Sequence, residues 1–341
     1  MNAALASRAA ATLPSDRWPA WPSFALQVDL LPILSGWYRE GKRFVIATLI
    51  DTVGSSPRPL GSEMAIGADG QVAGYVSGGC VEAAVALEAM SVLHDGQPRW
   101  LDYGQGSEVV DIQLSCGGRI GVLVWAPPDA GEYLTRWRKA RANRRPFYVA
   151  LHRRRGTLRY LSTARDLAGD EFLQCHRPPL RLVLVGADPA ILALVTLAAP
   201  LGMEVRVLRP HGPVEPPPGL AVAHYDRRAL EVALAELALD ADCAIYSLAH
   251  DSAIDLQVVS RALSSEAACI GVLGSRGKRK QRVEALRAQG HEASALERLR
   301  MPAGLRLGPA SPQAIALGIL AEAHHAVAEA AQRASTSVAA L

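Results

Sequence analysis

Two cysteines of the chain stand in matching surroundings, each next to a pair of glycines. Residues 78–80 read Gly-Gly-Cys and residues 116–118 read Cys-Gly-Gly. A strand pattern precedes Cys80 and an Ala-rich, helix-favouring run follows at 83–93, so we expect this thiol at the start of a helix. The helix dipole and the backbone N–H groups there favour the thiolate, which ligates metals or attacks sulfur. A small buried side chain is the alternative interpretation of either cysteine.

The glutamate that follows this glycine turn, Glu82, could cap the predicted helix or exchange protons.

A zinc site does not fit, because no closely spaced set of Cys and His residues would complete four ligands. The two glycine-flanked cysteines therefore predict a site for thiolate chemistry other than zinc binding.

A second candidate site follows a predicted apolar strand at 269–273. Gly274, Ser275 and Arg276 come directly after that strand, and a basic helix pattern begins at Lys278. A glycine-rich backbone, a hydroxyl, an Arg side chain and a helix N-terminus together make a natural phosphate-binding site. The alternative is that the run of Lys and Arg forms a solvated helix face.

Polar residues also follow the strand predicted at 243–248. His250 and Asp251, with Asp255 nearby, would lie at the carboxyl edge, where parallel sheets bind ligands. Asp251 could equally serve as the N-cap of the next helix.

The first turn of this expected sheet departs from the pattern that binds dinucleotides. Gly186 is followed by Asp188 and Ile191 at the positions of the second and third glycines. A carboxylate there repels a pyrophosphate, and Arg209 stands where an acidic residue would hold the ribose. Arg209 could pair with a 2′-phosphate, but the broken glycine pattern argues against NAD(P) as a cofactor.

The composition is that of an ordinary globular protein. Among 341 residues, Lys+Arg number 36 and Asp+Glu number 33, while 50% are hydrophobic and 20% are charged. These values argue against chain-wide disorder, collagen and a nucleic-acid-coating protein. The longest apolar run, 191–203, is shorter than the ~20 residues of a membrane-spanning helix. The five cysteines lack the spacing of a disulfide framework, so we expect a reducing, cytoplasmic location.

Apolar periodicity predicts an α/β protein with more than one domain. The first domain, residues 26–128, begins with a helix at 29–40. A buried strand at 43–53 then forms a hairpin with 62–66. The first domain is therefore expected to be mixed α/β.

The second domain, residues 181–330, alternates apolar strands with helices, which predicts a doubly wound parallel sheet. Its last helix is expected to begin at Ser311-Pro312 and to extend past His325. The remaining segments are expected to be a flexible lead-in at 1–25, a solvated connecting segment at 129–180 and a tail at 331–341.

Several of these motifs resemble one known family in the same order. The N-terminal domain of the XdhC/CoxI family is similar to GSSPRPLG at 54–61, SGGCVE at 77–82 and SCGG at 115–118. Its Rossmann-type C-terminal domain is similar to HDSAID at 250–255, IGVLGSR at 270–276, PAGL at 302–305 and SPQAIALGILAE at 311–322. The resemblance covers roughly residues 36–126 and 180–328.

This resemblance implies an accessory protein for xanthine dehydrogenase and related molybdenum hydroxylases, without turnover of its own. Such a chaperone binds molybdenum cofactor, as molybdopterin or its cytidine dinucleotide form, and supports addition of the terminal sulfido ligand with a cysteine desulfurase. It then delivers the cofactor to an apo xanthine, aldehyde or carbon monoxide dehydrogenase. No nucleic acid or membrane partner is expected, and the apolar last helix would suit a homodimer interface.

The resemblance also implies roles for particular residues. Cys80 and Cys116 would contact the molybdenum end of the cofactor, while Arg58 and residues 274–276 would help to hold its organic part. The full set of expected cofactor-binding residues is Arg58, Ser77, Gly78, Gly79, Cys80, Glu82, Cys116, His250, Asp251, Gly274, Ser275 and Arg276.

Two departures from the family pattern concern the first turn of the second domain. Relatives usually have glycine where Asp188 stands and an acidic residue where Arg209 stands, which puts nucleotide binding at that turn in doubt. The alternatives are an NAD(P)-dependent redox enzyme with a cysteine in its first domain, and a scaffold that only docks a partner enzyme.

Overall fold

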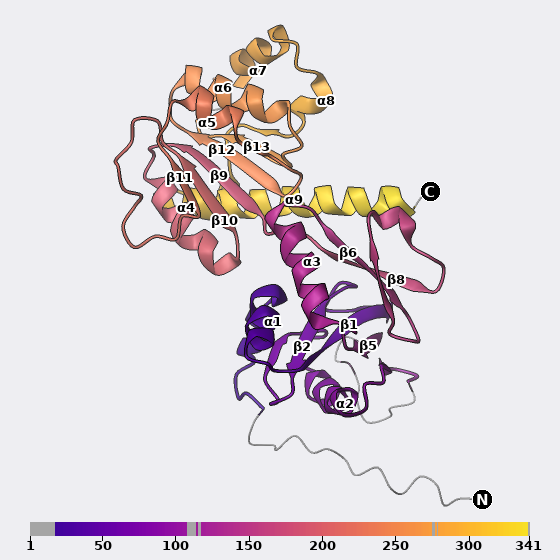
Figure 1. Ribbon diagram of the computed structural model, residues 1–341. Coiled ribbons are helices and arrows are strands. Elements are labelled where there is room, and N and C mark those ends of the chain that lie inside the picture. The colour runs from indigo at the N-terminus through magenta and orange to yellow at the C-terminus, as the bar shows by residue number, and fades with distance from the viewer. Residues whose placement is uncertain (1–17, 108–113, 115–116, 275–276, 278, 340–341) are drawn as a thin grey trace, which may run out of the picture. The chain divides into compact units, whose positions relative to one another are not determined.

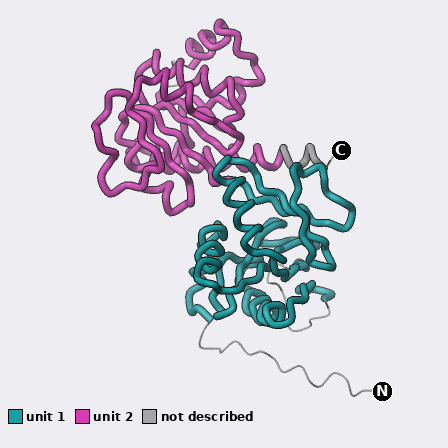
Figure 2. Tube along the Cα trace, viewed as in Figure 1, with its two compact units in different colours: residues 1–177 teal, residues 178–341 magenta. Residues whose placement is uncertain are grey.

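The computed structural model describes residues 18–107, 114, 117–274, 277 and 279–339, of which 334–339 are described by their backbone alone. The chain divides into two compact units, residues 1–177 and residues 178–341 (Figure 2). Each unit has its own helices and at least one sheet of its own, as Figure 1 shows. The α/β fold class predicted from the sequence is confirmed.

Unit 1 is built on an antiparallel sheet of five strands in the order β3-β2-β1-β5-β4. The strands are β1 (Phe44–Val53), β2 (Glu63–Gly67), β3 (Val72–Gly74), β4 (Arg99–Gly104) and β5 (Arg119–Trp125). β1 and β2 form the predicted hairpin, in which Phe44 lies opposite Gly67.

Both faces of β1 are buried, because its side chains alternate between two cores. Val45 and Leu49 pack in a core with α2 (Glu82–Asp95). Ile46 and Ile50 pack on the other face with α1 (Leu30–Arg39) and α3 (Ala130–Ala142). A short 3-10 turn, η2 (Ser23–Leu26), precedes α1. The sheet is therefore enclosed between helices.

Residues 129–177 are folded into unit 1, unlike the solvated connecting segment expected from their charge. They form α3, η3 (Ala164–Asp166) and an antiparallel sheet of β7 (Leu158–Leu161), β6 (Phe147–His152) and β8 (Glu171–His176). Tyr133, Leu134 and Trp137 of α3 are buried in the same core as α1, while Arg136 and Arg138, on either side of Trp137, are exposed. The charges thus mark the solvent side of an amphipathic helix.

Unit 2 has the doubly wound sheet that the sequence predicts. Its six parallel strands lie in the order β11-β10-β9-β12-β13-β14, which is the Rossmann order. They are β9 (Arg181–Gly186), β10 (Glu204–Leu208), β11 (His224–Asp226), β12 (Cys243–Leu248), β13 (Cys269–Val272) and β14 (Leu299–Arg300). The strand order reverses between β9 and β12, where such folds bind ligands.

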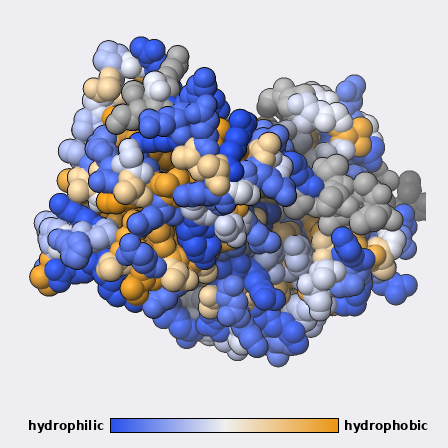
Figure 3. Space-filling view, turned by 90° about the horizontal axis from the view of Figure 1, so that it is seen from above, coloured by the Kyte–Doolittle hydropathy of each residue, from blue (hydrophilic) through white to orange (hydrophobic). Residues whose placement is uncertain are grey.

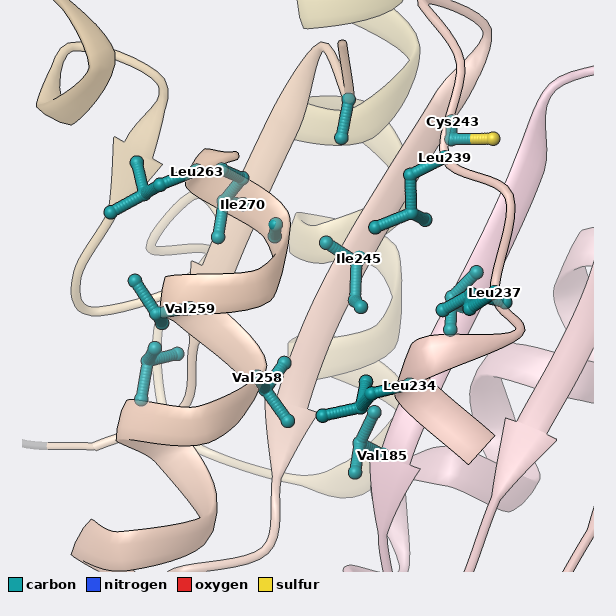
Figure 4. Close-up of a cluster of buried hydrophobic side chains, with 14 of the residues drawn as sticks. Val185, Leu234, Leu237, Leu239, Cys243, Ile245, Val258, Val259, Leu263 and Ile270 are labelled. Carbon is teal, nitrogen blue, oxygen red and sulfur yellow. The ribbon is translucent and has the colours of Figure 1, made fainter. Parts of the chain in front are cut away.

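Helices cover both faces of this sheet. One face carries α4 (Ala190–Ala198), its extension η4 (Ala199–Leu201) and α9 (Pro312–Ala339), which continues into the expected tail. The other carries α5 (Leu230–Ala235), α6 (Ser252–Leu263) and α7 (Arg279–Ala288), with α8 (Ala293–Leu296) alongside. In Figure 4, Leu234 of α5 and Val258 of α6 point toward Val185 and Ile245 of the sheet.

The surface is mixed in character. Figure 3 shows one face, on which apolar residues lie between more numerous hydrophilic ones. Within the described part of the chain, no helix combines the length and the apolar character that crossing a membrane requires.

Candidate functional site

Three loops of unit 1 meet where β1 ends. They are residues 54–61, residues 75–81, named here the Cys80 loop, and residues 117–118 before β5. A Cβ atom added to Gly78 would lie 3.7 Å from Pro57 Cγ, and one added to Gly118 would lie 2.0 Å from the carbonyl oxygen of Ser55. The structure thus brings two glycine-rich motifs and the 54–61 loop together.

Arg58 is held against the Cys80 loop by an aromatic ring. Its Cζ lies 4.2 Å from the ring centroid of Tyr75, and its Nη1 donates to the Tyr75 hydroxyl at 3.2 Å. Its Nε atom is buried and has no hydrogen-bond partner among the described residues. Arg58 therefore retains a donor that a ligand could use.

Glu82 holds the Cys80 loop in place through hydrogen bonds. This first residue of α2 is fully buried, and its carboxylate accepts from the backbone N–H of Ser77 at 2.7 Å and from the Ser77 hydroxyl at 2.9 Å. Further bonds come from the N–H groups of Val76 and Val81, each at 3.3 Å. Ser77 is also fully buried, so this pair fixes the loop rather than presenting polar atoms to solvent.

Cys80 is exposed, as are Gly78 and Gly79 before it. It comes two residues before α2 begins, as the sequence predicts, and it is not a buried core residue. Gly79 beside it has φ +102°, a conformation that favours glycine, and no described atom lies within 4 Å of a Cβ added there. The loop therefore carries an exposed cysteine directly after this glycine.

Cys116, Ser275 and Arg276 lie outside the described residues. Among the residues that are described, no group of three or more His, Cys, Asp and Glu side chains is arranged to hold a metal ion.

The carboxyl edge of the unit 2 sheet contains a pair that the sequence analysis missed. Asp188, after β9, accepts from the N–H of Ala190 at 2.7 Å at the start of α4. Its other oxygen lies 2.6 Å from Nε2 of His250, which follows β12. An internal carboxylate thus takes the N–H group that a pyrophosphate would use in a dinucleotide site. The strand order would reveal this pair, because β9 and β12 are neighbours.

Three other residues predicted to bind the cofactor, Asp251, His250 and Gly274, lie in different surroundings. Asp251 is the N-cap of α6 and accepts from the N–H groups of Ala253 at 2.8 Å and Ile254 at 3.0 Å, so the capping alternative is the one observed. His250 itself has φ +57° and is largely exposed. Gly274 follows β13, and a Cβ added there would lie 3.3 Å from Nη1 of Arg282.

Comparison with family models gives two matches. Residues 182–323 match the XdhC Rossmann domain, and residues 37–104 match the XdhC and CoxI family. These ranges contain most of the residues just described.

Two proteins of Escherichia coli (strain K12) are similar to the chain. The molybdenum cofactor insertion chaperone PaoD is 30% identical over 287 residues, which are 83% of this chain and 83% of PaoD. The uncharacterized protein YqeB is 25% identical over 284 residues, and the match covers 82% of this chain but 42% of YqeB.

A solved structure described as a xanthine dehydrogenase from Bacillus halodurans has the same fold. It superimposes with a TM-score of 0.71 at 23% identity and covers 89% of this chain and 96% of its own.

Proposed function

Because the chain belongs to the XdhC and CoxI family, we propose that it binds molybdenum cofactor and delivers it to an apo molybdenum hydroxylase of the xanthine dehydrogenase type. The name of the relative PaoD, a molybdenum cofactor insertion chaperone, supports this proposal. The observation that carries it is the exposed thiol of Cys80 on a loop that Glu82 fixes and Arg58 borders.

The residues of the Cys80 loop suit both ends of this cargo. A thiolate is a soft ligand and matches molybdenum or sulfur at the metal end. Arg58, which borders the loop and whose Nε has no partner among the described residues, suits an oxygen of the pterin or its phosphate. The space beside Gly79, which no described atom occupies, leaves room for the cargo to approach the backbone. Cys116 is proposed as the second thiolate.

The roles of the other predicted residues follow from their contacts. Ser77 and Glu82 bind each other, so we assign them the positioning of the Cys80 loop rather than contact with the cofactor. Gly274 to Arg276 are proposed to hold phosphate oxygens. The carboxylate of Asp188 at the start of α4 argues against the alternative of an NAD(P)-dependent enzyme.

The proposal extends to two steps beyond binding. While the cofactor is held, a cysteine desulfurase supplies the sulfur for the terminal sulfido ligand, and the chain then transfers the cofactor to the apoenzyme. Neither step requires the chain to turn over a substrate.

Transfer provides the test. An apo hydroxylase is incubated anaerobically with cofactor and either the wild-type chain or its Cys80→Ala variant, and the recovered hydroxylase activity is measured. The proposal predicts activation by the wild type and a loss of most of it in the variant. Cys175→Ala is the matched control, because Cys175 is also exposed but lies on β8. Equal activation by all three proteins would count against the role of Cys80.

A further inference from the structure

Unit 2 contains a cavity of about 160 Å³ between α6 and α7, at the end of β13. Its walls are mainly apolar and include Leu256, Val259 and Val272. Two charged side chains, Asp255 and Arg282, also line it. No step of the proposed function assigns this cavity an occupant.

Asp255 and Arg282 form a buried ion pair. Asp255 is 2% exposed, and its Oδ1 accepts from the Ser247 hydroxyl at 2.7 Å. Its Oδ2 accepts from Nη2 of Arg282, whose side chain is 14% exposed. The guanidinium is thus fixed in place by the carboxylate, and the carboxylate by Ser247.

The pair has hydrogen-bonding capacity that the described residues do not use. Nε and Nη1 of Arg282 are buried and have no partner among them. Leaving a buried donor unpaired is unfavourable, so an occupant of the cavity that accepts these bonds would gain affinity. Each oxygen of Asp255 can also accept a further bond, since a carboxylate offers about four lone-pair sites.

The absence of a side chain at Gly274 lets the backbone lie close to this guanidinium. A Cβ there would lie 3.3 Å from Nη1, which is tight contact. A larger residue at 274 would therefore crowd a donor that has no partner among the described residues.

The charge of the site selects the class of occupant. The ion pair is neutral overall, and Asp255 would repel a phosphate brought into the cavity. A neutral ring that carries both an acceptor and a donor fits better, because it can satisfy Arg282 and Asp255 together. The volume agrees, since an apolar cavity of about 150 Å³ holds one benzene ring.

We infer that this cavity binds a six-membered aminopyrimidine-type ring, with a ring carbonyl accepting from Arg282 and an amino group donating to Asp255. This inference rests on the proposed function for its source of such a ring. Molybdenum cofactor supplies one in its pterin, and the cytidine dinucleotide form supplies another in its cytosine.

The test uses free fragments as probes of the full chain. Cytidine 5′-monophosphate and a simple pterin are titrated separately, and binding is followed by ligand-observed NMR. Arg282→Lys is the main variant, because it keeps a positive charge beside Asp255 while losing the planar set of donors. Arg287→Gln is the control, since Arg287 is exposed on the same helix.

We expect one of the probes to bind the wild type and the control equally, and to bind Arg282→Lys roughly tenfold more weakly. The probe that binds identifies cytosine or pterin as the source of the ring. Binding of neither probe, or equal binding to Arg282→Lys, would overturn the inference. Molybdenum cofactor is titrated in parallel, so that loss of the cavity assignment with cofactor binding retained leaves the proposed function standing. Probe binding without cofactor binding would contradict the proposed function alone.

Discussion

The Glu82 carboxylate accepts hydrogen bonds from two groups of Ser77. The distance from Oε1 to the backbone nitrogen is 2.7 Å, and the distance from Oε2 to the hydroxyl oxygen is 2.9 Å. Both residues are fully buried, and they lie within or next to the loop that carries the exposed Cys80. The position of the thiol is therefore set by an interaction between two residues that are five positions apart in the sequence.

Glu82→Gln should destabilise this loop. The amide NH₂ of glutamine would face one of the buried donors, so we expect the free energy of unfolding in urea to fall by about 1–3 kcal/mol. Ser77→Ala should cost less, because it removes the hydroxyl bond but keeps the backbone one. Equal effects of the two substitutions would contradict this order.

Gly118→Ala should disturb the contact between the loops. The new Cβ would lie 2.0 Å from the carbonyl oxygen of Ser55, so the backbone has to shift. We expect a loss of roughly 1–3 kcal/mol in the free energy of unfolding. Gly78→Ala is the matched control, because its Cβ would meet nothing closer than 3.7 Å among the described atoms. An unchanged stability of Gly118→Ala would contradict the observed approach.

The stability of unit 1 should depend on pH through Glu63. Burial raises the pKa of this carboxyl from 4.5 to about 8, so the folded chain keeps a proton that the unfolded chain releases above pH 4.5. The contribution of Glu63 to stability is therefore present below pH 4.5 and is lost as the pH rises toward 8. Unfolding in urea at several pH values should show this loss in the wild type and not in Glu63→Gln.

His176, whose Nδ1 lies 3.8 Å from Glu63 Oε2, acts at the other end of the pH range. Burial lowers the pKa of this imidazole from 6.5 to about 3, so the unfolded chain binds a proton that the folded chain excludes. The contribution of His176 to stability is lost as the pH falls from 6.5 toward 3.

For Glu63, a difference in the free energy of unfolding between wild type and Glu63→Gln that stays constant from pH 5 to 8 would contradict the assignment.

Dinucleotides should not bind at the first turn of the unit 2 sheet. The Asp188 carboxylate already accepts from the Ala190 N–H and adds a negative charge where the pyrophosphate would lie. Equilibrium dialysis with NAD⁺ and NADP⁺ should give no saturable binding to the wild type. Asp188→Gly removes the carboxylate, so binding gained by that variant would identify the charge as the barrier. Saturable binding to the wild type would contradict this account.

Local sequence patterns predicted much of the fold. The β1–β2 hairpin and the Rossmann sheet were predictable, because strand periodicity and turn residues are encoded within short segments. The folded state of residues 129–177 was not predictable from local pattern. Tyr133 and Trp137 are buried against α1, which is distant in sequence, while the charges nearby suggested a solvated segment.

The candidate site, too, has features that local sequence predicts and contacts that it does not predict. The start of α2 near Cys80 and the capping alternative for Asp251 follow from local rules. The pairs Asp188–His250 and Asp255–Arg282 join residues 62 and 27 positions apart, on different elements. Such pairs depend on the strand order, which single-residue patterns do not encode.

The most direct test of the account is anaerobic equilibrium binding of molybdenum cofactor to the purified chain, with Cys80→Ala and Cys175→Ala compared. We expect saturable binding by the wild type and by Cys175→Ala, and at least tenfold weaker binding by Cys80→Ala. Wild-type affinity in Cys80→Ala would contradict the placement of the cofactor at the Cys80 loop, and no binding by the wild type would contradict the proposed function itself.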